Sequence, residues 1–167
     1  RSVGRMVDAL AELGELDDTI FIFTSDNGGS REGEAVGTTA YYVHLLQGDD
    51  VDADLARLDL IGGPQTTPHY PRGWAMLGNT PFRLWKRFAW LGGVRTPLVA
   101  HWPKGIPARG EVRTQFCHAI DLLPTILDAA GIDAPKVVDG VPQQRIDGAS
   151  LKPTFDDAQA QNPRATQ

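Results

Sequence analysis

Cysteine is almost absent from this chain of 167 residues, in which Cys117 is the only one. A single thiol forms no intrachain disulfide, and it excludes a zinc site built from several cysteines. Long apolar runs are missing too, because none approaches the roughly 18 to 20 residues that a membrane-spanning helix needs. The sequence therefore predicts neither a disulfide-stabilised fold nor a membrane-spanning helix, and we expect no membrane partner.

Positive charge is also in short supply. The 21 acidic side chains outnumber the 16 basic ones, which gives a formal net charge of −5. An acidic chain is poorly suited to hold nucleic acid, so we expect no nucleic-acid partner. Apolar residues make up 41% of the sequence, which is enough to build a packed core.

The spacing of apolar residues predicts a layered α/β protein. Residues 2–13 carry apolar side chains at helical spacing and are followed by Gly14, a typical helix stop. Residues 19–24 (TIFIFT) form a continuous apolar run, typical of a strand buried on both faces. Residues 96–103, bounded by prolines, predict a second short strand. Helix, short turn and buried strand together indicate a mainly parallel sheet flanked by helices.

A second helix is predicted over residues 119–131 (AIDLLPTILDAAG). Asp121 is placed to cap its N-terminus, Pro124 is tolerated in its first turn, and Gly131 ends it. Between about residues 30 and 80 the pattern is irregular. A long irregular segment in a compact domain is expected to serve a site or to cover one.

We expect residues 1–151 to form part of one domain and residues 152–167 to be a polar, mobile end. The sequence opens on Arg1 rather than on methionine, and it does so inside a helical pattern. We therefore expect the chain to be a piece of a longer protein.

The first predicted strand is followed by Asp26, Asn27 and two glycines. In open α/β sheets, ligands bind beyond the carboxyl ends of the strands, where these side chains would lie. A carboxylate and an amide oxygen suit Ca²⁺ or Mg²⁺, and the glycines would let the backbone turn sharply enough for both side chains to face one point. Asp-Asn-Gly is also a common turn, which the tripeptide alone favours by roughly three to one.

Residues 79–105 interleave cations with aromatic rings ahead of a Gly-Gly turn. The residues concerned are Arg83, Lys86, Arg87 and Arg95 among Phe82, Trp85, Phe88 and Trp90. Such a pattern can bind single-stranded nucleic acid, although on an acidic chain it is more often an amphipathic edge whose long side chains reach water. A third interpretation is a lysine point charge aimed at a bound oxyanion.

Four segments, in this order, resemble the C-terminal half of the core domain of type I sulfatases, and most of all the large bacterial arylsulfatases. They are FTSDNGG, YPRGWAMLGNTPFRLWKRFAWLGGVRTPLVAHWPKGI, HAIDLLPTILDAAGI and GVPQQRIDGASL. The resemblance is patchy across residues 30–68 and nearly continuous from Tyr70 to Leu151. It implies part of the α/β sandwich of the alkaline phosphatase superfamily, in a bacterial enzyme that hydrolyses small-molecule sulfate esters.

The resemblance also implies roles for three residues. In the family this Asp-Asn pair binds the active-site Ca²⁺, so Asp26 and Asn27 are expected to be metal ligands, with Mg²⁺ as the alternative ion. The family lysine ahead of a Glu-Gly-Gly turn contacts the sulfate of the substrate, and here that lysine is Lys86. The turn departs from the family pattern, because Leu91 stands where most relatives have glutamate. A cation and an ammonium together would offset the negative charge that develops on the sulfate oxygens.

Other parts of the family's site are not found in this sequence. Sulfatases use a formylglycine made from the cysteine of a Cys-x-Pro-x-Arg motif, and an earlier aspartate pair completes the metal shell. No Pro-x-Arg follows Cys117, which we expect to be a buried or half-buried filler at a helix start. The formylglycine is therefore expected in an N-terminal part of a longer protein, and this chain alone is predicted to be inactive.

Two other functions are compatible with the same residues. One is a phosphonate or phosphate ester hydrolase of the same superfamily, which shares the nucleophile and the metal. The other, from a different class, is a truncated module that binds a partner or an anion without turnover. His44 and His69 lie in the irregular segment, where a role at the mouth of the substrate site competes with a solvated or structural role that is roughly four times as common. His101 and His118 are interpreted as structural, with His118 at the helix entry.

Overall fold

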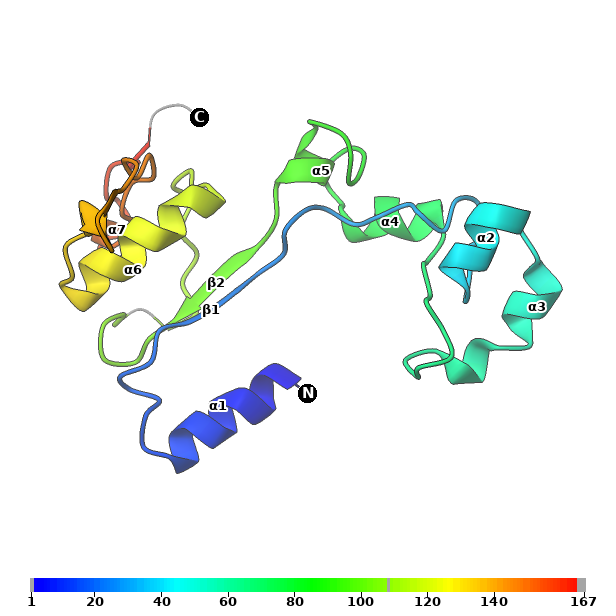
Figure 1. Cartoon of the computed structure of the whole chain (residues 1–167), viewed down its shortest axis with the longest axis horizontal. Coiled ribbons are helices and arrows are strands. Elements are labelled where there is room, and N and C mark those ends of the chain that lie inside the picture. Colours follow the sequence, from blue (N-terminus) through cyan, green and yellow to red (C-terminus); the bar gives the residue numbers. More distant parts are fainter. Residues whose placement is uncertain (1, 108, 165–167) are drawn as a thin grey trace. The chain divides into compact units, whose positions relative to one another are not determined.

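The structure is a computed structural model that describes residues 2–107 and 109–164. The chain divides into two compact units, one made of residues 1–22 with 100–167 and the other of residues 23–99. Figure 1 labels helices α1 to α7 and strands β1 and β2. Among the described helices, none has the length and apolar character that crossing a membrane requires.

Helix α1 (Ser2–Glu12) confirms the first predicted helix. Gly14 ends it with a φ of 74°, a left-handed conformation that glycine adopts without steric cost. The N–H of Glu15 then donates to the carbonyl of Leu10 at 2.9 Å, which closes the C-terminal turn. None of the residues of α1 is buried, and Met6 on its apolar side is 53% exposed.

Strands β1 (Phe21–Thr24) and β2 (Leu98–His101) pair in a two-stranded sheet and lie side by side in Figure 1. Both strands confirm predictions, although each is shorter than the predicted range of residues. Phe23 is 51% exposed, so the prediction that the first strand is buried on both faces is wrong. An apolar strand is shielded only where other elements cover its faces, and among the described residues nothing covers the Phe23 side chain fully.

A 3₁₀ turn, η2 (Ala119–Asp121), leads directly into helix α6 (Leu122–Ala130) and changes the predicted cap. Asp121 takes the N-cap position of α6, as predicted, but its side chain makes no capping bond to α6, and His118 caps the 3₁₀ turn instead. The Nδ1 of His118 accepts a hydrogen bond from the N–H of Ile120 at 3.3 Å, and the Asp121 carboxylate accepts one from the N–H of His118 at 2.8 Å. Because the 3₁₀ turn starts the helical segment early, Asp121 occupies the third position of a capping box.

Helix α6 ends where the sequence predicts. Gly131 has a φ of 68°, and its N–H donates to the carbonyl of Asp128 at 3.2 Å. The predicted stop is therefore confirmed, and the structural interpretation of His118 at the helix entry is confirmed as well.

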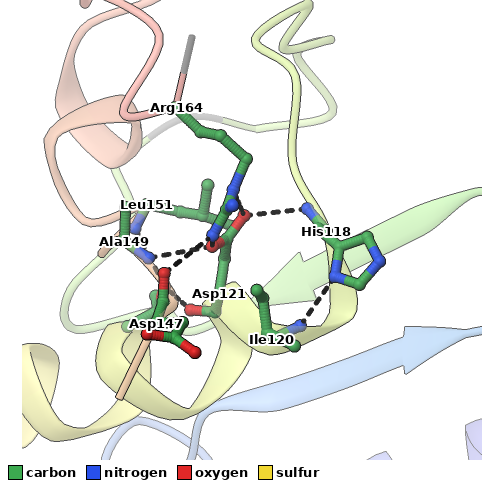
Figure 2. A network of polar contacts seen from close by, with 8 residues as sticks. His118, Ile120, Asp121, Asp147, Ala149, Leu151 and Arg164 are labelled. Carbon is green, nitrogen blue, oxygen red and sulfur yellow. Dashed lines mark hydrogen bonds and ion pairs between the residues drawn. The ribbon is translucent and has the colours of Figure 1, made fainter. Parts of the chain in front are cut away.

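Asp121 is the centre of the polar network in Figure 2. Its fully buried carboxylate accepts hydrogen bonds from the N–H of Ala149 at 2.8 Å and from the guanidinium of Arg164 at 2.6 and 3.3 Å. The same guanidinium donates to the carbonyl of Asp147 at 3.2 Å. Burial raises the pKa of Asp121, but the hydrogen bonds from Arg164 and the backbone outweigh it, so the pKa is lowered overall.

The C-terminal part of this unit adds short elements. Strands β3 (Val137–Val138) and β4 (Val141–Pro142) pair antiparallel, and α7 (Pro153–Asp156) follows. Thr154 and Phe155 in α7 are buried, with exposures of 7% and 9%. Mobility of the C-terminal end stays a prediction, and its last three residues lie outside the described part of the chain. A mainly parallel sheet also stays a prediction.

The second unit contains short helices that the sequence analysis missed. They are α2 (Tyr41–Gln47), α3 (Val51–Leu55), the 3₁₀ helix η1 (Leu58–Leu60), α4 (Arg72–Gly78) and α5 (Leu91–Val94). Two β-bridges, Thr38 with His69 and Ala40 with Thr67, join the two ends of the segment that holds α2, α3 and η1. Most of the predicted irregular segment is therefore a set of short helices whose two ends are held together by β-bridges.

Candidate active site

Asp26 and Asn27 follow the end of β1, as the sequence predicts. The Nδ2 of Asn27 donates a hydrogen bond to Oδ1 of Asp26 at 2.8 Å, so the two side chains lie together. Asp26 is exposed and Asn27 is half-buried. Because the Asn27 nitrogen faces Asp26, the amide oxygen is the atom left to bind a cation. That the pair binds a metal stays a prediction.

The oxygen atoms of Asp26 and Asn27 are of the kind that hard cations such as Ca²⁺ and Mg²⁺ bind. Within residues 2–107 and 109–164, no group of three or more His, Cys, Asp or Glu side chains could hold a metal ion. Ca²⁺ takes about six to eight oxygen ligands, so Asp26 and Asn27 would form only part of a shell.

The loop that carries the Asp-Asn pair is hydrogen-bonded to the segment that carries Lys86. The N–H of Gly28 donates to the carbonyl of Gly93 at 3.0 Å. The N–H of Gly29 donates to Oδ1 of Asn79 at 2.8 Å, and its carbonyl accepts from the N–H of Lys86 at 2.9 Å. Two segments that are distant in sequence thus share one backbone framework.

Close approach of two backbones explains the glycines in this framework. A Cβ on Gly28 would lie 1.7 Å from the carbonyl oxygen of Gly92, and one on Gly93 would lie 2.1 Å from that of Phe88. Neither Gly28 nor Gly29 has a positive φ. Residues 26–28 nevertheless form a bend, as predicted, and Gly28 in addition allows a close contact with the Gly92 carbonyl.

Lys86 is paired with a residue that the sequence analysis did not single out. Its Nζ lies 3.2 Å from Oε1 of Glu32; the side chains are 42% and 17% exposed, respectively. Burial raises the pKa of Glu32, but the hydrogen bond and charge of Lys86, together with a backbone hydrogen bond, outweigh it, so the pKa is lowered overall. Glu32 lies three residues after Gly29, in a segment without apolar periodicity. The sequence therefore gives no sign that it pairs with Lys86.

The backbone around Lys86 is unusual. Leu84 and Arg87 have φ values of 64° and 84°, in the left-handed region that non-glycine residues rarely adopt. Such conformations cost roughly 1–3 kcal/mol and persist only where surrounding contacts hold them. Here Asn79 supplies one such contact, because its Nδ2 donates to the carbonyl of Leu84 at 3.0 Å.

Two of the cationic side chains in residues 79–105 stack on aromatic rings of the same segment. The guanidinium of Arg83 lies 4.8 Å from the ring centroid of Trp90, and that of Arg95 lies 4.9 Å from that of Phe82. These contacts favour the interpretation of the segment as an amphipathic edge. Lys86 differs from both because it pairs with a carboxylate instead.

The backbone and the ammonium of Lys86 have different neighbours. Its backbone lies against Gly29, but its ammonium points to Glu32. Convergence of that ammonium with Asp26 and Asn27 on a single anion therefore stays a prediction. Leu91, at the position where the family has glutamate, begins α5 and is 51% exposed.

Histidines of the second unit make local contacts. Nδ1 of His44 lies 3.2 Å from Oδ1 of Asp49. His69 belongs to a β-bridge, and its ring centroid lies 4.3 Å from that of Tyr41. These contacts support the structural interpretation of both residues.

Cys117 is half-buried, as predicted, and burial raises the pKa of its thiol, with the nearby Asp121 charge adding to the effect. A thiol with a raised pKa is mostly protonated at neutral pH and is a poor nucleophile. The interpretation of Cys117 as a filler is consistent with this setting.

Comparisons with known proteins match the sequence of this chain to sulfatases. The family model described as Sulfatase matches residues 1–132, which include the Asp-Asn pair and Lys86. An uncharacterised sulfatase of Schizosaccharomyces pombe is 33% identical over 80% of this chain and 23% of its own length. N-acetylgalactosamine-6-sulfatase of Sus scrofa is 30% identical over 92% of this chain and 21% of its own length. Steryl-sulfatase of Mus musculus is 31% identical over 83% of this chain and 17% of its own length. The chain thus spans about a fifth of the length of these relatives.

Proposed function

This chain belongs to the sulfatase family, and we propose that it supplies the C-terminal part of the catalytic domain of an arylsulfatase-type enzyme. The family has an alkaline-phosphatase-like α/β fold. We further propose that β1 and β2 belong to a mainly parallel sheet in the whole domain. The substrate would be a small-molecule sulfate ester.

One observation carries this proposal: the loop with Asp26 and Asn27 and the segment with Lys86 share hydrogen bonds. The bond from the N–H of Lys86 to the carbonyl of Gly29 is 2.9 Å long. A metal-binding pair and a sulfate-binding lysine must lie on one rigid framework to act on one anion. The close packing of Gly28 on Gly92 gives that framework little freedom.

In the proposed site, Asp26 and Asn27 bind Ca²⁺, with Mg²⁺ as the alternative ion. The bound cation would polarise the sulfate group as a Lewis acid. The two oxygens are accessible, since one residue is exposed and the other half-buried. The other metal ligands and the formylglycine nucleophile are proposed to come from an N-terminal part of the longer protein.

Lys86 would donate hydrogen bonds from its ammonium to the non-bridging sulfate oxygens. Negative charge grows on these oxygens and on the leaving oxygen as the ester bond breaks, and a fixed cation stabilises it. The ammonium is partly open to solvent, with 42% of the Lys86 side chain exposed. An anion can therefore reach it.

The test uses the protein encoded by the complete reading frame. We expect Lys86→Ala to lower kcat/KM for an aryl sulfate by about 100- to 1,000-fold, as loss of one oxyanion donor does in other enzymes. Lys136→Ala, which removes an exposed lysine, is the matched control and should leave activity unchanged. A chelator should abolish activity and added Ca²⁺ should restore it, while the isolated chain should show no turnover.

Other outcomes identify the alternatives. Full activity of Lys86→Ala would remove Lys86 from the site. Faster turnover of a matched phosphonate or phosphate ester would identify the related hydrolase. Absence of turnover on both esters, in a folded full-length protein, would support a non-catalytic binding module.

A further inference from the structure

Glu32 is an acidic residue in a setting that normally disfavours a charge. Its side chain is 17% exposed, and its Oε2 is buried without a hydrogen-bond partner among the described residues. Burying a carboxylate in this way is unfavourable unless a cation compensates it. The compensating cation is the ammonium of Lys86, 3.2 Å from Oε1.

The backbone holds both members of this ion pair. Lys86 is fixed through its N–H to the carbonyl of Gly29. Glu32 is followed by Gly33, where a Cβ would lie 2.4 Å from the carbonyl oxygen of Tyr70, so that the loop is packed against its neighbour. The backbones of Glu32 and Lys86 are therefore fixed relative to each other. The remaining freedom lies in the two side chains, and most of it in the longer chain of the lysine.

We propose that Glu32 is a positioning residue that holds the Lys86 ammonium in place for its contact with the sulfate of the substrate. The inference rests on the proposed function. An ammonium has three N–H donors, and Glu32 takes one, which leaves the others for sulfate oxygens. Glu32 acts through Lys86 and need not touch the substrate itself.

Positioning by Glu32 has a measurable consequence, since it removes conformational freedom that substrate binding would otherwise have to remove. A side chain as flexible as lysine loses entropy when it is fixed in one geometry. With Glu32 in place, that loss has already occurred before sulfate binds. Without Glu32, the ammonium samples other positions and meets the sulfate less often in the productive one.

A double-mutant cycle in the full-length protein tests this idea, with an aryl sulfate as the substrate. We expect Glu32→Gln to lower kcat/KM roughly 10- to 100-fold, the range for hydrogen bonds to charged groups. In a Lys86→Ala background, the same change should cost less than about 2-fold, because the group on which Glu32 acts is gone. A purely structural role would cost activity equally in both backgrounds, and that result would overturn the proposal.

Glu34→Gln is the matched control, because Glu34 lies on the same loop and forms its own ion pair with Arg31. Its kcat/KM should stay within about 2-fold of wild type, since exposed ion pairs contribute little. Equal losses in Glu34→Gln and Glu32→Gln would overturn the proposal, because they would trace the effect to the charge or the folding of the loop.

Glu32→Asp covers the case in which Glu32→Gln fails to fold. It keeps the charge but withdraws the carboxylate by one methylene, so we expect an intermediate loss of kcat/KM at an unchanged thermal midpoint. If Glu32→Asp kept the wild-type kcat/KM, the proposed role of Glu32 would be overturned, whereas the proposed function would stand. Wild-type kcat/KM in Lys86→Ala would instead overturn the proposed function, so the two failures are distinguishable.

Discussion

A fully buried carboxylate is useful to a protein only where other groups satisfy it, and Asp121 meets that condition. Two backbone N–H groups and the guanidinium of Arg164 converge on it (Figure 2). The segments that it joins are far apart in sequence, since Ala149 and Arg164 both lie beyond α6. One side chain thus ties the start of α6 to the C-terminal part of its unit.

We expect Asp121→Asn to lower the free energy of unfolding by about 3 kcal/mol, because it removes one partner of a buried ion pair and leaves Arg164 uncompensated. Asp156→Asn, at an exposed carboxylate of α7, is the control and should change stability by less than about 0.5 kcal/mol. Urea unfolding of the full-length protein at pH 7 measures both. Similar losses in the two variants would contradict the role of the network.

The same residue predicts a pH dependence. The folded pKa of Asp121 is lowered relative to its unfolded value, which is about 3.9. Its contribution to stability is therefore complete above about pH 4 and is lost as the pH falls through the folded pKa. The stability difference between wild type and Asp121→Asn should shrink when unfolding is measured at pH 3 instead of pH 7. A constant difference across this range would show that the Asp121 charge does not contribute.

At the scale of elements, the contact between the DNGG loop and the LGG turn sets the geometry of the candidate site. A side chain on Gly28 would overlap the Gly92 carbonyl, and one on Gly92 would overlap the carbonyls of Arg83 and Leu84. The contact also orders the backbone of Lys86 through Gly29. Packing of the loop after β1 against α5 and the segment before it therefore positions the candidate site residues.

We expect Gly28→Ala to lower the free energy of unfolding by about 1–3 kcal/mol, because the added methyl group overlaps the Gly92 carbonyl. Gly73→Ala is the control: its Cβ would have no neighbour within 4 Å, and it lies in α4. Alanine in a helix should stabilise that variant by about 0.5–1 kcal/mol. Thermal unfolding and kcat/KM of the full-length protein report both effects, and a neutral Gly28→Ala would contradict the close contact.

Some of these elements were predictable from the sequence because their cause is local. Helix α1 and its stop at Gly14 follow from apolar spacing and the conformational freedom of glycine. The placement of Asp26 and Asn27 after a strand follows from a short apolar run. In each case, neighbours in sequence are also neighbours in space.

The rest could not be predicted because its cause is distant in sequence. Glu32 pairs with Lys86, although several short helices separate them in the sequence. Gly28 and Gly92, which lie in contact, are separated by an even longer stretch of sequence. Helices such as α2 are too short for apolar periodicity to stand out. His118 was expected at the helix entry, but the 3₁₀ turn that it caps was missed because such a turn has no clear sequence signal.

At the scale of the whole molecule, the chain buries few apolar side chains. Ala75, Leu151 and Phe155 are the buried hydrophobic residues of the described chain. Large apolar side chains such as Leu46 and Val112 are 85% and 81% exposed. Exposed apolar surface on this scale marks an interaction face or a liability to aggregate. The proposed membership of a larger catalytic domain explains it, because the rest of that domain would cover part of the surface.

We therefore expect the isolated chain to be poorly soluble or only partly folded, whereas the full-length protein should be soluble and fold cooperatively. The isolated chain should self-associate in size-exclusion chromatography, bind a dye such as ANS, and protect few amides from hydrogen exchange. Coexpression with the N-terminal part should reduce dye binding, because the two parts would cover each other's apolar faces. A monomeric isolated chain with a sharp unfolding transition and little dye binding would contradict this prediction, and it would show that these exposed side chains need no further cover.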